Sequence, residues 1–190
     1  MNVSFRCGLF FGGLFAISIG VTELAAAQSF TVSNLRVNAP EGQGWEMVHK
    51  TQFGLAFMAP QQFTNSKLVA YANLFDPSVD SRGELLNDVK RNIDRFLNQP
   101  HSRILSSKFE LTKVRKYPCV RVYAKMEIVP QDQSKNSVPT PAQARLFICR
   151  NTAGAPTGFV AGFMYFGNEL SESLDAKASA FLTGVRFATE

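Results

Sequence analysis

The sequence predicts an α+β fold in which an antiparallel sheet packs against two main helices. Several segments alternate apolar and polar side chains with period two, which is typical of half-buried strands. Two other segments carry apolar side chains at helical spacing, which indicates helices with one buried stripe. The longest strand-like segments follow one another between residues 117 and 166, an order that favours antiparallel neighbours joined by hairpins.

Residues 1–27 show the three parts of a secretory signal peptide. Arg6 gives a positive start, residues 7–22 are apolar, and residues 25–27 are small alanines suited to cleavage before Gln28. The apolar run is short for a membrane span, and no second run follows it. We therefore expect an exported chain, periplasmic or secreted, with no transmembrane anchor after the signal is removed. Cys7 is expected to leave with the signal.

Residues 28–190 are expected to form one α+β domain. Removal of residues 1–27 from the 190 leaves 163 residues, an ordinary length for a single domain. A domain of this size buries about 68–70 % of the surface that its unfolded chain exposes, so it needs no metal to fold. Trp45, the only tryptophan, is interpreted as a core anchor rather than as a platform for a ligand.

The first strands are expected near the start of this domain. Residues 29–37 alternate weakly, and residues 45–50 and 53–58 are expected to pair in a hairpin. Residues 67–75 are apolar on both sides, which indicates a central strand covered on both faces. Residues 103–113 and 158–166 are further predicted strands.

Two helices are predicted from apolar stripes and capping residues. Ser81 and Glu84 fit a capping box, in which each side chain bonds an otherwise unpaired backbone N–H group. The stripe of this first helix consists of Leu85, Leu86, Val89, Ile93, Phe96 and Leu97. Asn168 is expected to cap a last helix over residues 169–183, with Gly184 at its end.

A hairpin of residues 117–129 and 144–150 is the centre of the prediction. The apolar sides of its two strands are Val120, Val122, Ala124 and Met126, and Ala144, Leu146 and Ile148. These sides coincide in the register that sets Cys119 opposite Cys149, whereas a shift of one residue turns an apolar side onto a polar one. The same register sets Arg121 opposite Phe147 and Tyr123 opposite Arg145. The pattern therefore permits a disulfide between the two cysteines.

This disulfide would close a loop of about 30 residues and stabilise the fold by about 3–4 kcal/mol in the chain-entropy model. The alternative is a redox-active cysteine pair. The spacing differs from Cys-x-x-Cys and no histidine lies near either cysteine in sequence, so a structural disulfide is the favoured interpretation. An even number of cysteines in the mature chain also fits an oxidising compartment.

Residues 130–143 are predicted to form a long solvated hairpin loop. They contain three prolines together with Gln, Ser, Asn, Asp and Lys. The segment is either a loop tip without a role or a recognition loop, since loops on rigid scaffolds often carry binding residues.

Residues 103–150 carry most of the positive charge. Ten lysines and arginines stand against three acidic residues, so this region is +7 and the rest of the mature chain is −2. Arg121, Lys125 and Arg145 are expected to share one side of the hairpin, and Lys135 lies in the loop. Such a basic face suggests an acidic protein or an anionic envelope component as partner, the alternative being an ordinary solvated surface. No run typical of nucleic-acid binding is present, so no nucleic acid is expected.

The sequence contains no signature of catalysis. Its two histidines, His49 and His101, have no metal-ligand spacing, and no Gly-x-Ser-x-Gly or glycine-rich phosphate motif occurs. We therefore assign no catalytic residue, no metal and no cofactor. Carboxylates that meet only in space stay open, so a small hydrolase-like enzyme with a cleft between sheet and helix is the alternative hypothesis.

Three stretches carry a resemblance to a known family. They are residues 52–63 (Gln-Phe-Gly-Leu-Ala-Phe-Met-Ala-Pro-Gln-Gln-Phe), the meander of residues 117–166, and the closing Ala-Phe-Leu-Thr-Gly-Val-Arg-Phe of residues 180–187. In these stretches the chain resembles the PsbP family, the extrinsic subunits of photosystem II, whose architecture a small eukaryotic regulator of the Ran GTPase shares. The resemblance implies an α-β-α sandwich and a non-catalytic protein that docks onto others, and no partner or metal residue carries over by position.

Overall fold

The structure is a computed structural model that describes residues 28–42, 44–59, 67–77, 81–97, 101–112, 115–129, 138–151, 157–167 and 171–188. The predicted signal segment, residues 1–27, lies outside the described residues. None of the described helices has the length and apolar character that crossing a membrane requires.

The described strands form two antiparallel sheets. The larger has the order β3-β4-β5-β9-β8-β7-β6, and the smaller has the order β1-β2-β10. The strands of the larger sheet are β3 (Glu46–Lys50), β4 (Gly54–Met58), β5 (Leu68–Phe75), β6 (Ser102–Thr112), β7 (Cys119–Ile128), β8 (Thr140–Asn151) and β9 (Thr157–Phe166). Those of the smaller sheet are β1 (Ser29–Val32), β2 (Leu35–Asn38) and β10 (Arg186–Phe187).

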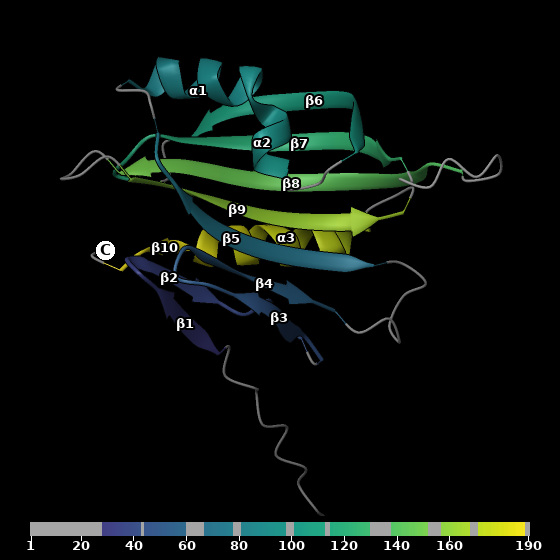
Figure 1. The fold of residues 1–190 in the computed structure, drawn as a ribbon, viewed down its shortest axis with the longest axis horizontal. Coiled ribbons are helices and arrows are strands. Elements are labelled where there is room, and N and C mark those ends of the chain that lie inside the picture. Colours follow the sequence, from purple (N-terminus) through teal and green to yellow (C-terminus); the bar gives the residue numbers. More distant parts are fainter. Residues whose placement is uncertain are drawn as a thin grey trace, which may run out of the picture.

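Helices lie on both sides of the larger sheet (Figure 1). α1 (Arg82–Arg91) and α2 (Ile93–Leu97) pack on one side, over β6, β7 and β8. α3 (Glu172–Gly184) packs on the other side, against β8 and β9, and shares a core with the smaller sheet. The predicted class, an α+β fold with an antiparallel sheet packed against helices, is confirmed.

Strand β7 shows how period two divides the interior into two cores. Its side chains Val120, Val122, Ala124 and Met126 are buried beneath α1 and α2. Cys119, on the opposite side of the strand, belongs to the core that contains Phe181 of α3. One strand therefore contributes to both layers, because successive side chains point to opposite faces of a sheet.

The predicted first helix is present but interrupted. Its capping box is confirmed: the Ser81 Oγ accepts from the Glu84 N–H at 3.0 Å, and the Glu84 carboxylate accepts from the Ser81 N–H at 2.6 Å. The single predicted stripe is divided between α1 and α2. The division occurs at Asn92, whose side chain bonds back to the carbonyl and carboxylate of Asp88 while its backbone leaves the helical region.

Helix α3 begins later than predicted. The cap expected at Asn168 is wrong, because the helix starts after Ser171, whose Oγ accepts the Leu174 N–H at 3.3 Å. The helix ends at Gly184, as expected. Its last turn carries no basic residue, and Arg115 from another part of the chain donates to the carbonyls of Thr183 and Val185 instead. A cation at this end is favourable because it opposes the helix dipole.

Two strand predictions are corrected. The strand expected over residues 29–37 is divided into β1 and β2, because the chain turns at Ser33, which has a φ of 51°. Residues 140–143 of the predicted 130–143 loop belong to β8 and pair with β7. Pro141 fits there because it lies at the start of the strand, where a missing N–H group costs little. Residues 130–137, including Lys135, lie outside the described residues.

Tyr71 of β5 fastens α2 to the sheet. Its hydroxyl donates to the Phe96 carbonyl at 2.5 Å inside the core. Gly162 lies opposite Tyr71 on β9, and a Cβ there would lie 2.2 Å from the Tyr71 ring, so only glycine leaves room for it. Burial raises the pKa of the Tyr71 hydroxyl well above its ordinary value, which keeps the hydroxyl neutral and able to donate.

Candidate binding face

The predicted register of the central hairpin is confirmed. β7 and β8 pair with Cys119 opposite Cys149, and the partners along the strands are Arg121 with Phe147 and Tyr123 with Arg145. Arg121, Lys125 and Arg145 therefore lie on one side of the sheet, the side on which α3 packs. The prediction succeeded because both strands alternate strictly, so only one register hides both apolar sides.

Cys119 and Cys149 form a disulfide. Their Cα atoms are 4.1 Å apart, and neither side chain is exposed. The Arg150 N–H donates to the Pro118 carbonyl in the adjacent pair, so the cysteines occupy a non-hydrogen-bonded pair, the arrangement that brings facing side chains closest. Complete burial denies access to a thiol or reductant, which favours the structural interpretation over a redox-active pair.

Beyond α3, the same side of the sheet is open to solvent and carries the charged residues. We call this surface the basic face. It consists of Arg103, Ser106, Lys108 and Glu110 of β6, Arg121, Tyr123, Lys125 and Glu127 of β7, and Gln143 and Arg145 of β8. Its position follows from the placement of α3, which packs mainly on β8 and β9, so that the side chains of β6 and β7 beyond the buried Thr112 and Cys119 reach solvent.

Three of the five cations on the basic face have anionic partners. Arg103 pairs with Glu127, Lys108 Nζ lies 2.5 Å from the Glu110 carboxylate, and Arg145 Nε lies 2.8 Å from the Asp175 carboxylate of α3. The hydrogen bond to Glu110 and its negative charge raise the pKa of Lys108. These pairs neutralise much of the positive charge that the sequence places in this region.

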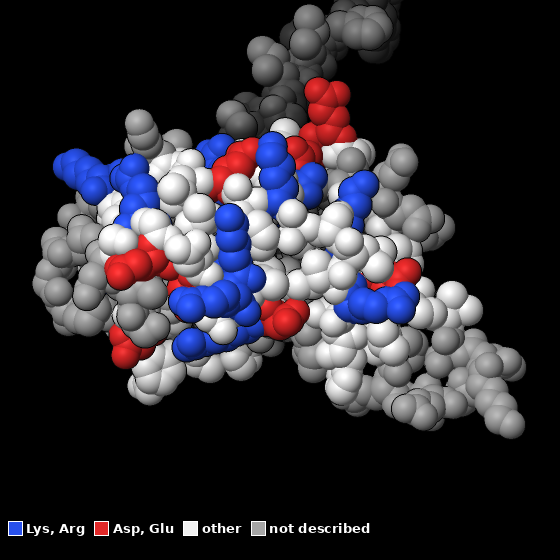
Figure 2. Space-filling view, turned by 90° about the horizontal axis from the view of Figure 1, so that it is seen from above, with Lys and Arg blue, Asp and Glu red and all other residues white. Residues whose placement is uncertain are grey.

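Arg121 and Lys125 have no ion-pair partner within 4 Å among the described residues. The Lys125 side chain is exposed, and the Arg121 guanidinium lies 6.0 Å from the centre of the Phe147 ring. Other cations of the region are used inside the protein: Arg115 caps α3, and Arg150 is buried. Figure 2 views the end of the molecule that carries α1 and β6, and there basic side chains are interspersed with acidic ones.

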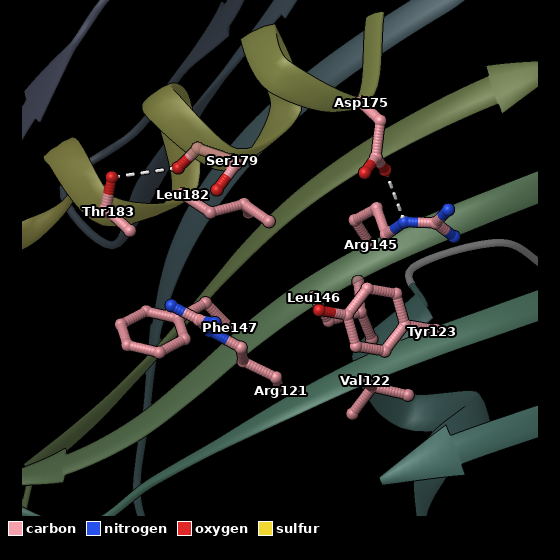
Figure 3. A pocket seen from close by; sticks show the side chains of 10 residues that line it. All are labelled: Arg121, Val122, Tyr123, Arg145, Leu146, Phe147, Asp175, Ser179, Leu182 and Thr183. Carbon is pink, nitrogen blue, oxygen red and sulfur yellow. Dashed lines mark hydrogen bonds and ion pairs between the residues drawn. The ribbon is translucent and has the colours of Figure 1, made fainter. Parts of the chain in front are cut away.

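Tyr123 and Arg145 form the middle of the basic face. The Arg145 guanidinium lies 4.8 Å from the centre of the Tyr123 ring, within range of a cation–π interaction. Figure 3 shows Asp175 reaching from α3 to Arg145, and Arg121 lying beside the Phe147 ring. No local spacing in the sequence predicts the Arg145–Asp175 pair, since the pair depends on where α3 packs on the sheet.

The cavities near this face are small or shallow. A notch of about 60 Å³ lies between Arg121, Arg145 and the α3 residues Asp175, Ser179 and Thr183 (Figure 3). A shallow hollow of about 310 Å³ lies over Ser106, Lys108, Lys125, Gln143 and Arg145. The notch is well below the volume of a typical small-molecule site, and the hollow lies at the lower end of that range.

A wider open groove of about 700 Å³ lies elsewhere, between the β1–β2 turn and the ends of β5 and β9. Its described lining residues are Ser33, Asn34, Phe53, Leu74, Phe75, Asp76 and Thr157, among which Asp76 is the only ionisable side chain. In the described part of the chain, no group of three or more His, Cys, Asp and Glu side chains is placed to hold a metal ion. The described lining of this groove contains no convergent ionisable groups of the kind that the enzyme hypothesis requires.

No family model matches the chain, and no curated protein matches it. Among solved structures it is similar to the Ran-binding protein Mog1p of Saccharomyces cerevisiae, with 8% identity, a TM-score of 0.46, and 86% of this chain and 97% of that chain covered. A mutant of Mog1 gives 7% identity and a TM-score of 0.47, with 86% and 96% covered. A protein of Bacteroides thetaiotaomicron gives 13% identity and a TM-score of 0.46; 85% of this chain is covered, and the chain spans 48% of that protein. These likenesses concern the fold alone.

Proposed function

We propose that this is an exported, non-catalytic binding or accessory protein that docks onto an acidic partner, a protein or an anionic envelope component, through the basic face. The observation that carries the proposal is the position of Arg121 and Lys125. Both lie on the same side of β7, with Tyr123 between them, and neither has an anionic partner among the described residues. Lys125 lines the shallow hollow, and Arg121 lines the notch beside α3.

The side chains of this face suit carboxylate or phosphate groups. The Arg121 guanidinium presents donors in a planar fork that matches such groups, whereas Lys125 supplies a mobile point charge. Because both sit on a rigid sheet held by the neighbouring disulfide, little order has to be gained when a partner binds. The disulfide is also compatible with export, since such bonds persist in oxidising compartments.

The proposal is tested by binding to an immobilised poly-glutamate peptide at low and moderate salt. The double variant Arg121→Glu, Lys125→Glu is expected to bind about tenfold more weakly or worse, because it replaces two attractive contacts by repulsive ones. The control variant Lys50→Glu, Lys90→Glu makes the same change in net charge at exposed positions on β3 and α1, away from the basic face. It should retain most of the affinity.

Equal losses in the two double variants would show that only net charge matters, and the basic face would lose its role. The predicted loop is examined in the same assay by Lys135→Glu. A loss confined to that variant would assign binding to the 130–143 segment instead of the sheet.

A further inference from the structure

Strand β6 lies at one edge of the larger sheet, and some of its backbone groups have no hydrogen-bond partner among the described residues. The Val129 N–H donates to the His101 carbonyl, and the Arg150 N–H donates to the Pro118 carbonyl. Both bonds imply that odd-numbered residues of β7 direct their backbone groups toward β6. Their partners Ser106, Lys108 and Glu110 therefore bond to β7, and Ser107, Phe109 and Leu111 direct their N–H and C=O groups outward.

We propose that β6 pairs with β6 of a second copy of this chain, antiparallel, with Phe109 on the two-fold axis. The two larger sheets then join into one continuous sheet. In this register Phe109 faces Phe109, Ser107 faces Leu111, and Lys108 faces Glu110 across the axis. All outward N–H and C=O groups of Ser107, Phe109 and Leu111 gain partners, because residues facing each other in these pairs exchange both bonds.

The charge pattern of β6 selects this register among its neighbours. With the axis at Phe109, Lys108 lies opposite Glu110 of the second copy in a non-hydrogen-bonded pair, where facing Cβ atoms are about 4.5–5.5 Å apart. With the axis one residue earlier, two Lys108 side chains would face each other, and one residue later two Glu110 side chains would. Since Lys108 and Glu110 already contact each other within one chain, the dimer would contain four alternating charges.

The apolar side of β6 supports the same register. Phe109 is half-buried and packs against the core beneath α1 and α2, whereas Leu111 is 43% exposed. With the axis at Phe109, the two phenylalanine rings meet at the centre, and each Leu111 lies diagonal to the other copy's Phe109. Diagonal neighbours lie within reach of aromatic side chains, so the exposed leucines become covered.

The irregularity between Ile104 and Ser106 sets the end of the pairing. The register of β6 against β7 shifts there, and Leu105 projects with 57% exposure. A bulge twists an edge strand away from a neighbour, so pairing is confined to residues 106–112. Lys108 and Glu110 belong to the basic face, but Arg121 and Lys125, the two cations on which the proposed function rests, take no part in the contact.

The experiment is a sedimentation-equilibrium measurement of the purified protein at low salt, with four variants. The wild type is expected to dimerise. Lys108→Glu and Glu110→Lys each turn both cross-axis pairs into like-charge pairs, so each should weaken the dimer about tenfold or more. The double variant Lys108→Glu, Glu110→Lys exchanges the signs and should restore the dimer. Lys50→Glu, at an exposed position on β3 at the opposite edge of the sheet, makes the same change in charge as Lys108→Glu and should leave the dimer unchanged.

A monomeric wild type would overturn the proposal. So would a dimer that the single variants do not weaken, because the contact would then lie elsewhere or in another register. Failure of the double variant to recover association would overturn the pairing of Lys108 with Glu110. Circular dichroism of each variant confirms that the fold is intact, as expected for two exposed positions on an edge strand.

Discussion

The two sides of strands β7 and β8 differ in how their covering helices are held. On one side, α1 and α2 cover an entirely apolar surface, and a hydrogen bond from Tyr71 to the Phe96 carbonyl fastens α2 from inside the core. On the other side, α3 covers only part of the sheet, and Arg145 joins it to the sheet through Asp175 at a partly exposed position. The first side is a closed core, and the second is half core and half charged surface.

This difference shows that most charged side chains on these strands occur at the positions that no helix covers. Cys119 and its cross-strand neighbours Thr112 and Cys149 are buried. Arg121 and Tyr123 are only partly buried, and their neighbours on β6, Glu110 and Lys108, reach solvent. A cation at Arg145 is tolerated because it sits at the border, where Asp175 and the Tyr123 ring compensate for its partial desolvation. The candidate site therefore lies where the core of the α3 side ends.

The largest loss of stability is expected when the disulfide on the α3 side is removed. The double variant Cys119→Ala, Cys149→Ala should lower the free energy of unfolding by about 3–4 kcal/mol, because an open loop of about 30 residues gains entropy when the chain unfolds. Urea unfolding of the oxidised wild type and of the variant measures the difference. A loss below about 1 kcal/mol would mean that the hairpin holds its register without the bond.

The second largest loss of stability is expected in the core between the sheet and helices α1 and α2. Tyr71→Phe removes the donor to the Phe96 carbonyl and leaves a buried acceptor unpaired, which should cost about 1–3 kcal/mol at neutral pH. The ring still fills the space opposite Gly162, so the loss comes from the hydrogen bond alone. Equal stability of the two proteins at neutral pH would contradict a net contribution from this bond.

The pH dependence gives the same variant a second test. Burial raises the pKa of Tyr71, so the folded state holds its proton at pH values where the unfolded chain has lost it. The Tyr71 hydroxyl makes its full contribution to the free energy of unfolding below about pH 10, the ordinary tyrosine pKa. Above that pH the contribution falls by about 1.4 kcal/mol for each pH unit. The stability difference between wild type and Tyr71→Phe should therefore shrink as the pH rises above 10. A difference that stays constant would contradict the raised pKa.

The central hairpin was predictable from sequence because β7 and β8 alternate strictly. The cysteine pair, the facing residues of Arg121 and Tyr123, and the capping box at Ser81 all follow from short-range patterns. The extension of β8 to Thr140 was missed because Pro141 and its polar neighbours have the composition of a loop. A strand can nevertheless begin with such residues when a long neighbour such as β7 provides the partners.

The candidate site was only half predictable. The common side of Arg121, Lys125 and Arg145 follows from period two, whereas the anions that neutralise Arg145 and Arg103 depend on tertiary placement. Asp175 had a sufficient local explanation, since acidic residues are favourable in the first turn of a helix. A count of charges therefore overstates the number of cations available to a partner, because it cannot show which cations are already paired within the protein.

The smallest effect on stability, and the most informative for function, is expected from Asp175→Asn. The carboxylate is 49% exposed, so loss of its pair with Arg145 should cost less than about 1 kcal/mol and should vanish at high salt. Glu172→Gln, in the same first turn, controls for the helix dipole. Because Arg145 loses its anion but keeps its place beside the Tyr123 ring, the Asn variant should bind poly-glutamate several-fold more tightly than Glu172→Gln does. Equal affinities would exclude Arg145 from the binding surface and leave Arg121 and Lys125 as its cations.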